Sequence, residues 1–195
     1  MKVVHTRYPP YDAIINCAWD TTWISITQLL IRRSLLDRIG LFRAEFGSWG
    51  DYEWNIRSSL LTPRVHVPEF LATWRRTPGQ PTQDAVFSTA MWHRKAVEMI
   101  RLAYQAAKDI DPASVKSIPL RELLLPEMQE IVKATIRDCT GFPQKILKLI
   151  ALFFSFPYAT LTCIAHRTIR RDGAFGLGPQ QVQKLLSKAD LLEQK

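Results

Sequence analysis

The spacing of hydrophobic and polar positions changes once along the chain, near the stretch RRTPGQPTQD. Before it, residues 23–33 (WISITQLLIRR) form a β-branched apolar run that predicts a buried strand. Ser34 and Gly40 then bracket a short helix as N-cap and C-terminal stop. The run VHVPEFLATW has strand character again, with Pro68 marking a break or a sheet edge. The first part is therefore expected to mix strands and helices.

After that stretch the period is helical. Residues 84–110 predict one long helix, because apolar side chains recur at steps of three, four and seven and make one stripe. The stripe consists of Val86, Ala90, Val97, Ile100 and Tyr104. PEMQEIVKATIRDC predicts a helix that starts at Pro126, with Met128, Ile131, Val132 and Thr135 on one side. PQQVQKLLSKADLLEQK predicts another helix from Pro179.

Residues 149–165 contain no charged side chain and are the most apolar segment. Their length is at the short edge of the ~17–25 residues that cross a bilayer, and Pro157 near the middle disfavours a straight span. Cations flank the segment at Lys145, Lys148, His166, Arg167, Arg170 and Arg171. Three alternatives stay open: a buried hairpin bent at Pro157, an interfacial helix on an anionic membrane around 145–171, or a true span.

Composition places the chain among globular proteins: 195 residues, 47% hydrophobic and 23% charged, are enough for one sizeable core. The net charge of +8 favours an anionic partner, either nucleic acid, an acidic membrane surface or a phosphorylated ligand. Cys17, Cys139 and Cys163 are widely spaced, which disfavours a disulfide framework or a zinc site. The start MKVVHTRYPPYD has no apolar core of a signal peptide. We expect a cytoplasmic protein, peripheral at the cytoplasmic membrane if the basic segment binds lipid.

Three motifs follow one another within about sixty residues: LLIRRSLLDRIGLF, then GDYEWNIR, then VPEFLATWRRTPGQPT. Together they resemble the C-terminal half of the catalytic domain of family 2 glycosyltransferases, which have the GT-A fold. The resemblance covers residues 23–82. It implies an α/β fold for residues 1–82, as a partial GT-A-like domain with an incomplete sheet. Residues 83–195 would be a mainly α-helical extension.

The resemblance implies that Asp51 is the general base of an inverting, nucleotide-sugar-dependent transfer to a hydroxyl acceptor. A carboxylate at a helix N-terminus is expected to be held ionised, which suits a base. Gly50 would leave room for the acceptor, and Trp49 or Trp54 would offer a ring face to a sugar. The resemblance further suggests an arginine on the donor diphosphate, and the candidates for this contact are Trp74, Arg75 and Arg76.

Plainer interpretations stand beside these. Asp51 is equally well explained as a helix N-cap, and Trp54 better as a core residue. Glu53 and Arg57, four apart, predict an ion pair on the helix surface. Arg75 and Arg76 fit solvated surface charges.

The chain departs from the family pattern in three places. Thr77 stands where many relatives have a histidine, and only fifty residues precede Asp51, too few for a nucleotide-binding sheet. The complete family enzyme is expected to use Mg²⁺ or Mn²⁺ held by a DxD motif. The only match here, DID at Asp109–Asp111, follows the base and reads as a helix-end turn.

Two functions are therefore expected. One is a glycosyltransferase half of hexosyltransferase type, binding a hydroxyl acceptor and acting with a nucleotide-sugar donor and an upstream glycosyltransferase half. The other is a non-catalytic basic helical module that binds a membrane surface or a partner protein. Nucleic acid ranks lower, because the cations are scattered and no basic or aromatic RNA-binding motif is present.

Overall fold

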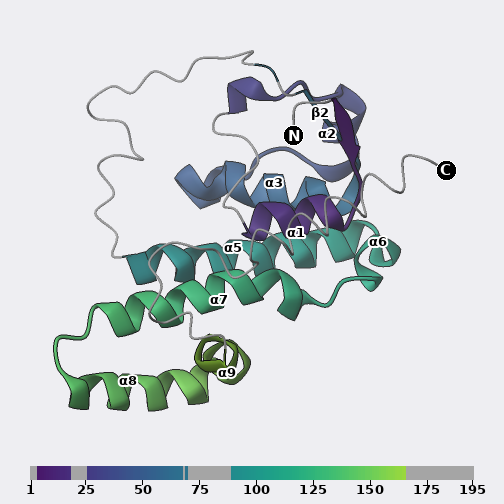
Figure 1. Cartoon of the computed structure of the whole chain (residues 1–195). Coiled ribbons are helices and arrows are strands. Elements are labelled where there is room, and N and C mark those ends of the chain that lie inside the picture. The colour runs from purple at the N-terminus through teal and green to yellow at the C-terminus, as the bar shows by residue number, and fades with distance from the viewer. Residues whose placement is uncertain (1–3, 19–25, 68, 70–88, 166–195) are drawn as a thin grey trace, which may run out of the picture.

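The computed structural model describes residues 4–18, 26–67, 69 and 89–165. This part of the chain is mainly helical and holds one two-stranded antiparallel sheet. Figure 1 shows the helices in layers: α1 and α3 lie above α5 and α7, and α8 and α9 lie below them. The elements are β1 (His5–Arg7), α1 (Tyr11–Ala18), α2 (Arg33–Ile39), α3 (Gly50–Leu61), β2 (Arg64–His66), α5 (Thr89–Ile110), α6 (Pro112–Lys116), α7 (Leu120–Arg137), α8 (Phe142–Ser155) and α9 (Pro157–Ala165).

The small sheet pairs β1 with β2 in the register His5 with His66 and Arg7 with Arg64. It is held to the helices by the buried Asp12 of α1, which lies 3.3 Å from Nε of Arg64 and 3.8 Å from Nη1 of Arg7. Burial raises the pKa of Asp12, while the two guanidinium groups act in the opposite direction. Arg64 also donates to the backbone oxygen of Asn55 on α3 at 2.6 Å. One arginine thus ties the sheet to two helices.

The strand predicted for residues 23–33 is wrong where the structure describes it. Residues 26–28 form a 3₁₀ turn, closed by the Leu29 N–H on the Ile26 oxygen at 3.0 Å, and α2 begins at Arg33. β-branched residues favour a strand only beside a partner strand, and the two strands of the described sheet pair with each other. The N-cap of α2 is Arg32 and not Ser34. Gly40 ends the helix as predicted and at a positive φ that favours glycine, but its φ of 83° and ψ of 166° are not the left-handed helical conformation expected there.

The predicted long helix is confirmed over its described residues as α5. Val97 and Ile100 are buried, and together with Ile131 and Val132 of α7 they belong to the main core. The expected start at residues 84–88 and the helix predicted from Pro179 lie outside the described residues. Cys17, Cys139 and Cys163 are all buried and free of disulfide bonds, and burial raises the pKa of Cys17 well above its usual value.

The helix expected to begin at Pro126 begins six residues earlier, at Leu120, and Pro126 lies inside α7. A proline there removes one backbone hydrogen bond, to the carbonyl of the residue four positions earlier. That residue, Glu122, is exposed. Leu123 and Leu124 are buried ahead of the proline, and this packing extends the helix through it.

The apolar segment forms two helices, α8 and α9, with the break at Phe156 immediately before Pro157. The break falls where expected, because proline disfavours helical backbone in the residue before it. Only the inner side is buried: Leu152 of α8 and Ala159, Thr160 and Cys163 of α9. The fully buried alternative is therefore wrong for the outer side. No helix in the described ranges is long and apolar enough to cross a membrane.

Candidate functional site

The segment that leads into α3 turns at Gly47, whose φ of 55° and ψ of −129° lie in a region that favours glycine. Trp49 is the N-cap of α3 and makes no side-chain capping bond. Asp51 therefore lies in the first turn of the helix, where its Oδ1 accepts a hydrogen bond from the Tyr52 N–H at 2.7 Å. The carboxylate is neither the N-cap nor buried, since Asp51 is exposed.

The pKa of Asp51 is raised and not lowered. Partial desolvation of the carboxylate raises it, and the backbone N–H groups of Tyr52 and of Asp51 itself only partly offset this. The expectation that the helix N-terminus holds Asp51 ionised is thus wrong in direction, because the loss of solvation outweighs the backbone hydrogen bonds. A carboxylate with a raised pKa is a stronger base once ionised, which is the property that proton abstraction from a hydroxyl requires.

Aromatic side chains from the start of α3 and from α5 meet. Trp49 is buried, lies edge-on to Tyr52 at 5.7 Å and contacts the ring of Trp92 at 4.3 Å between centroids. Trp92, from the first turns of α5, is 41% exposed. Among these rings, the accessible surface comes mainly from Trp92. The sequence signal for it was its position on α5, off the apolar stripe of that helix.

A polar network that includes the Tyr52 hydroxyl joins three helices. Nδ1 of His93 on α5 is 2.5 Å from Oε2 of Glu127 on α7. The Tyr52 hydroxyl of α3 donates to Oε1 of the same carboxylate at 3.5 Å. Glu127 is buried and follows Pro126 within α7. Sequence reasoning missed this group because its members are 41 and 34 positions apart, and only the packing of α3, α5 and α7 brings them together.

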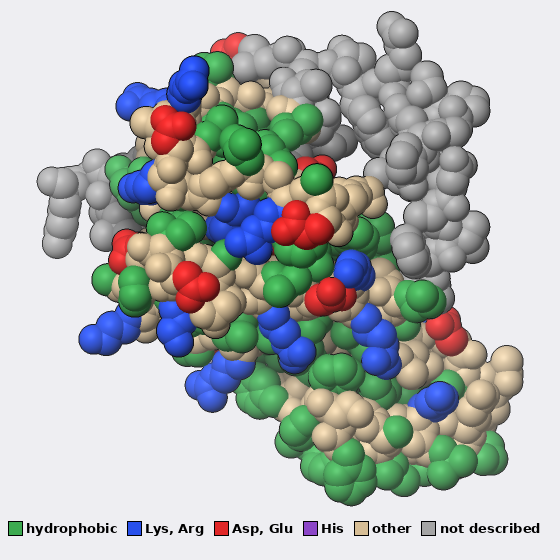
Figure 2. Space-filling view, turned by 180° about the vertical axis from the view of Figure 1, so that it is seen from behind, with side chains coloured by type: hydrophobic (Ala, Val, Ile, Leu, Met, Phe, Trp, Pro, Cys, Tyr) green, Lys and Arg blue, Asp and Glu red, His purple; other side chains and the backbone are tan. Residues whose placement is uncertain are grey.

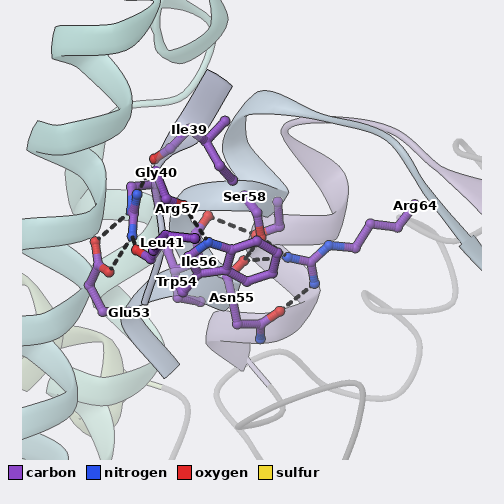
Figure 3. Close-up of polar contacts among 11 residues, drawn as sticks. Ile39, Gly40, Leu41, Glu53, Trp54, Asn55, Ile56, Arg57, Ser58 and Arg64 are labelled. Atoms are coloured by element: carbon purple, nitrogen blue, oxygen red, sulfur yellow. Dashed lines mark hydrogen bonds and ion pairs between the residues drawn. The ribbon is translucent and has the colours of Figure 1, made fainter. Parts of the chain in front are cut away.

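The position of α3 is fixed by a second, largely buried network, drawn in Figure 3. Nε of Arg57 lies 2.9 Å from Oε1 of Glu53, and Nη2 lies 3.1 Å from Oε2. The same guanidinium donates to the carbonyl oxygens of Ile39 and Leu41, at the end of α2. The predicted Glu53–Arg57 pair therefore forms, but in the core and not on the surface. The planar guanidinium binds the Glu53 carboxylate of α3 and the two carbonyl oxygens at the end of α2 at the same time. It therefore joins the two helices with a defined geometry.

Trp54 contributes to the same junction. Its Nε1 donates to the Gly40 oxygen at 3.0 Å, and its ring stacks on Phe42 with 4.7 Å between centroids. The side chain is buried, which confirms that it is a core residue and not a platform for a sugar.

The packing of the chain explains why residue 50 is a glycine. A Cβ at this position would lie 2.8 Å from the carbonyl oxygen of Arg43, and Gly50 is buried. The space left by the missing side chain is occupied by the protein's own backbone. Glycine is thus required for the 3₁₀ turn of residues 44–49 to pack on the start of α3.

Trp74, Arg75 and Arg76, the residues assigned to the donor diphosphate, lie outside the described residues. The DID motif lies at the junction of α5 and α6: Asp109 accepts from Gln105 at 2.7 Å, and Asp111 is the N-cap of α6. These geometries do not fit a metal site. In the described ranges no group of three or more His, Cys, Asp or Glu side chains is placed to hold a metal ion.

The described fold and site define a coarse class: a mainly helical protein with a small antiparallel sheet and a carboxylate presented from the first turn of a buried helix. No protein-family model, curated protein or solved structure matches the chain.

Proposed function

We propose that this chain supplies the acceptor side of an inverting glycosyl transfer. In this reaction an acceptor hydroxyl attacks the anomeric carbon of a nucleotide-sugar, a new glycosidic bond forms and the nucleotide diphosphate leaves. Asp51 takes the proton of the hydroxyl as its oxygen attacks. The motif resemblance over residues 23–82 supplies the reaction class, and the geometry around Asp51 supplies the chemical support.

The observation that carries the proposal is the state of the Asp51 carboxylate. It is exposed in the first turn of α3, and its pKa is raised by desolvation. The helix that carries Asp51 is held in position, because the Glu53–Arg57 pair and Trp54 fix it to the end of α2.

The aromatic group at the start of α3 gives the acceptor a surface. Trp92 is partly exposed and packs on Trp49, two residues before Asp51. Sugar rings present C–H faces that pack on aromatic rings, and the indole N–H can donate to a hydroxyl. We assign the acceptor contact to Trp92 supported by Trp49. Gly50 is left out of this contact, because its missing side chain makes room for the backbone of Arg43.

The proposal assigns the nucleotide-sugar and any divalent metal to a donor-binding half supplied by a second polypeptide or a preceding segment. Trp74, Arg75 and Arg76 stay the proposed contacts to the donor diphosphate. The residues of this chain bind and orient the acceptor and remove its proton. No step is assigned to a metal, because the described carboxylates do not form a site for one.

The test is a transfer assay. The chain is produced either fused to the polypeptide encoded immediately upstream of it or together with that polypeptide. Release of nucleotide diphosphate is measured with a panel of nucleotide-sugars and hydroxyl acceptors. Asp51→Asn is expected to lower kcat by about 10²–10⁴-fold, the usual contribution of a general base. Asp109→Asn, which removes an exposed aspartate on α5, is the control and should leave the rate unchanged. Equal rates for the wild type and Asp51→Asn, or no transfer with any donor, would overturn the proposal.

A further inference from the structure

The outer side of the α8–α9 hairpin consists of large apolar side chains that are exposed. Phe142, Ile146, Ile150 and Phe153 follow one another along α8 at steps of four, four and three residues. Leu147 and Phe154 form an adjacent row. Phe154 is 81% exposed, Phe142 76% and Leu147 69%. Figure 2 shows hydrophobic side chains gathered along the lower edge of the molecule, where the hairpin lies.

The second helix continues this surface. Tyr158, Leu161 and Ile164 of α9 are all about half exposed or more. The opposite side of α9 packs on α7, where Gln129 donates to Thr162 at 3.0 Å and Cys163 is buried. The orientation of the hairpin is therefore fixed by its inner side. Single exposed apolar residues need no explanation, but a contiguous group over two helices marks an interaction surface.

Charge distinguishes the possible occupants of this surface. From Cys139 to Arg171 the sequence contains no Asp or Glu. Lys145 and Lys148 are exposed on α8 and fall outside both apolar rows. A helix with aromatic and aliphatic side chains on one face, lysines on the other and no acids is the pattern of helices that lie in a membrane interface.

A second copy of the chain fits less well. A twofold dimer through this surface would place the same patch on both sides. Such a dimer would cover the apolar rows but leave Lys145 and Lys148, which fall outside both rows, with no carboxylate in either patch to pair with them. Residues 166–195 carry six Lys or Arg against three Asp or Glu, so this segment is basic as well. An anionic lipid surface satisfies both the apolar rows and the cations.

We propose that the outer face of α8–α9 docks the protein on an anionic phospholipid membrane, with the two apolar rows in the acyl region and Lys145 and Lys148 at the level of the headgroups. The helices lie in the plane of the membrane and do not cross it. Each lysine near such a surface contributes on the order of 1 kcal/mol, and this contribution is screened by salt. The inference does not depend on the proposed glycosyl transfer, since lipid binding needs no substrate.

The experiment is co-sedimentation of the full chain with vesicles of phosphatidylcholine alone and of phosphatidylcholine with phosphatidylglycerol. Binding is expected to the anionic vesicles, to be weaker on the neutral ones and to fall as salt rises. Leu147→Gln/Phe154→Gln removes two exposed apolar side chains and should lower the partition coefficient about tenfold or more. The matched control is Leu30→Gln/Leu41→Gln, which removes two exposed leucines outside the hairpin and should bind like the wild type.

The charge component has its own pair of variants. Lys145→Gln/Lys148→Gln should weaken binding to anionic vesicles by roughly tenfold to thirtyfold. Lys108→Gln/Lys116→Gln removes two exposed lysines near α6, at the other end of the helix layers in Figure 1, and should have little effect. Unchanged thermal unfolding of all four variants shows that a loss of binding is not a loss of folding.

Four results would overturn the proposal. They are the absence of binding to either vesicle, binding unaffected by Leu147→Gln/Phe154→Gln, and binding indifferent to lipid charge and to the lysines. The fourth is a soluble dimer that Leu147→Gln/Phe154→Gln dissociates, which would give the surface to a second copy. Hydroxyl-radical footprinting of the monomeric chain without lipid tests whether the face is accessible. Protection of Phe154 would mean that the chain itself covers this face, and it would also overturn the proposal.

Discussion

The guanidinium of Arg57 lies against the carboxylate of Glu53, one turn earlier on α3, with 2.9 Å between Nε and Oε1 and both side chains essentially inaccessible to solvent. Arg57 also serves as the donor for the carbonyl oxygens of Ile39 and Leu41. A buried pair of this kind is costly to form, but breaking it is costlier, because the remaining charge has no partner and no water. The junction between α2 and α3, which positions Asp51, therefore depends on the pair being complete.

Arg57→Met is expected to lower the free energy of unfolding by about 3–5 kcal/mol, the usual cost of leaving one buried ion unpaired. Urea unfolding followed by tryptophan fluorescence measures this. The control is Lys95→Met, which breaks the exposed Lys95–Glu98 pair of 2.9 Å and should cost less than about 1 kcal/mol. The double variant Glu53→Gln/Arg57→Met should recover part of the loss, because no charge is then buried alone. Equal midpoints for Arg57→Met and Lys95→Met would contradict this account.

Gly40→Ala should destabilise the protein by about 1–3 kcal/mol, the strain of a side chain in this positive-φ region. Gly40 has φ of 83°, and a Cβ there would lie 3.2 Å from Nη1 of Arg57, so the substitution also disturbs the buried pair. Gly141→Ala is the matched control: its φ is −127° and the nearest atom to its Cβ is 3.9 Å away. Its unfolding midpoint should stay close to that of the wild type. A Gly40→Ala protein as stable as Gly141→Ala would show that the turn adapts freely.

Asp51→Asn is expected to be more stable than the wild type at neutral pH. The raised pKa means that the folded state binds the Asp51 proton at a higher pH than the unfolded chain does. The contribution of Asp51 to stability is therefore present below its ordinary pKa and is lost as the pH rises through the raised value. The gain from Asp51→Asn should grow between about pH 4 and 7, which thermal unfolding across this range measures.

Asp109→Asn is the control for the loss of one surface negative charge in the Asp51 experiment. A difference between Asp51→Asn and wild type that shrinks with rising pH would have the wrong sign. It would mean that the helix N-terminus, and not desolvation, dominates at Asp51.

Acidification should destabilise the small sheet through His66. Burial lowers the pKa of His66, and the nearby charges of Arg7 and His5 lower it further. The stability that the neutral ring contributes is fully present above the ordinary pKa of 6.5 and is lost as the pH falls from there through the lowered pKa of the folded state. The melting temperature of the wild type should therefore fall more between about pH 7.5 and 5 than that of His66→Gln.

Val65→Thr changes an exposed neighbour on β2 and leaves both histidines in place, so it controls for the substitution itself. Parallel pH curves for His66→Gln and Val65→Thr would exclude His66 as the titrating group.

The helices α5 and α7 could be predicted from the sequence because their stability comes from one-sided apolar stripes, and a stripe is a property of spacing alone. The break before Pro157 and the stop at Gly40 were equally readable, since each follows from the backbone limits of a single residue type. The start of α7 was not readable. Pro126 is a good first residue of a helix, and only the burial of the leucines ahead of it shows that the helix passes through.

The candidate site divides in the same way. Asp51 could be found from the sequence because the motif around it is local, and the Glu53–Arg57 pair because helical neighbours four apart must meet. Burial of that pair, the raised pKa of Asp51 and the contacts of Trp92, His93 and Glu127 were decided by the packing of α3 against α2, α5 and α7. Spacing fixes which face of a helix a residue occupies. Solvation and long-range contact depend on what covers that face, and this only the folded chain determines.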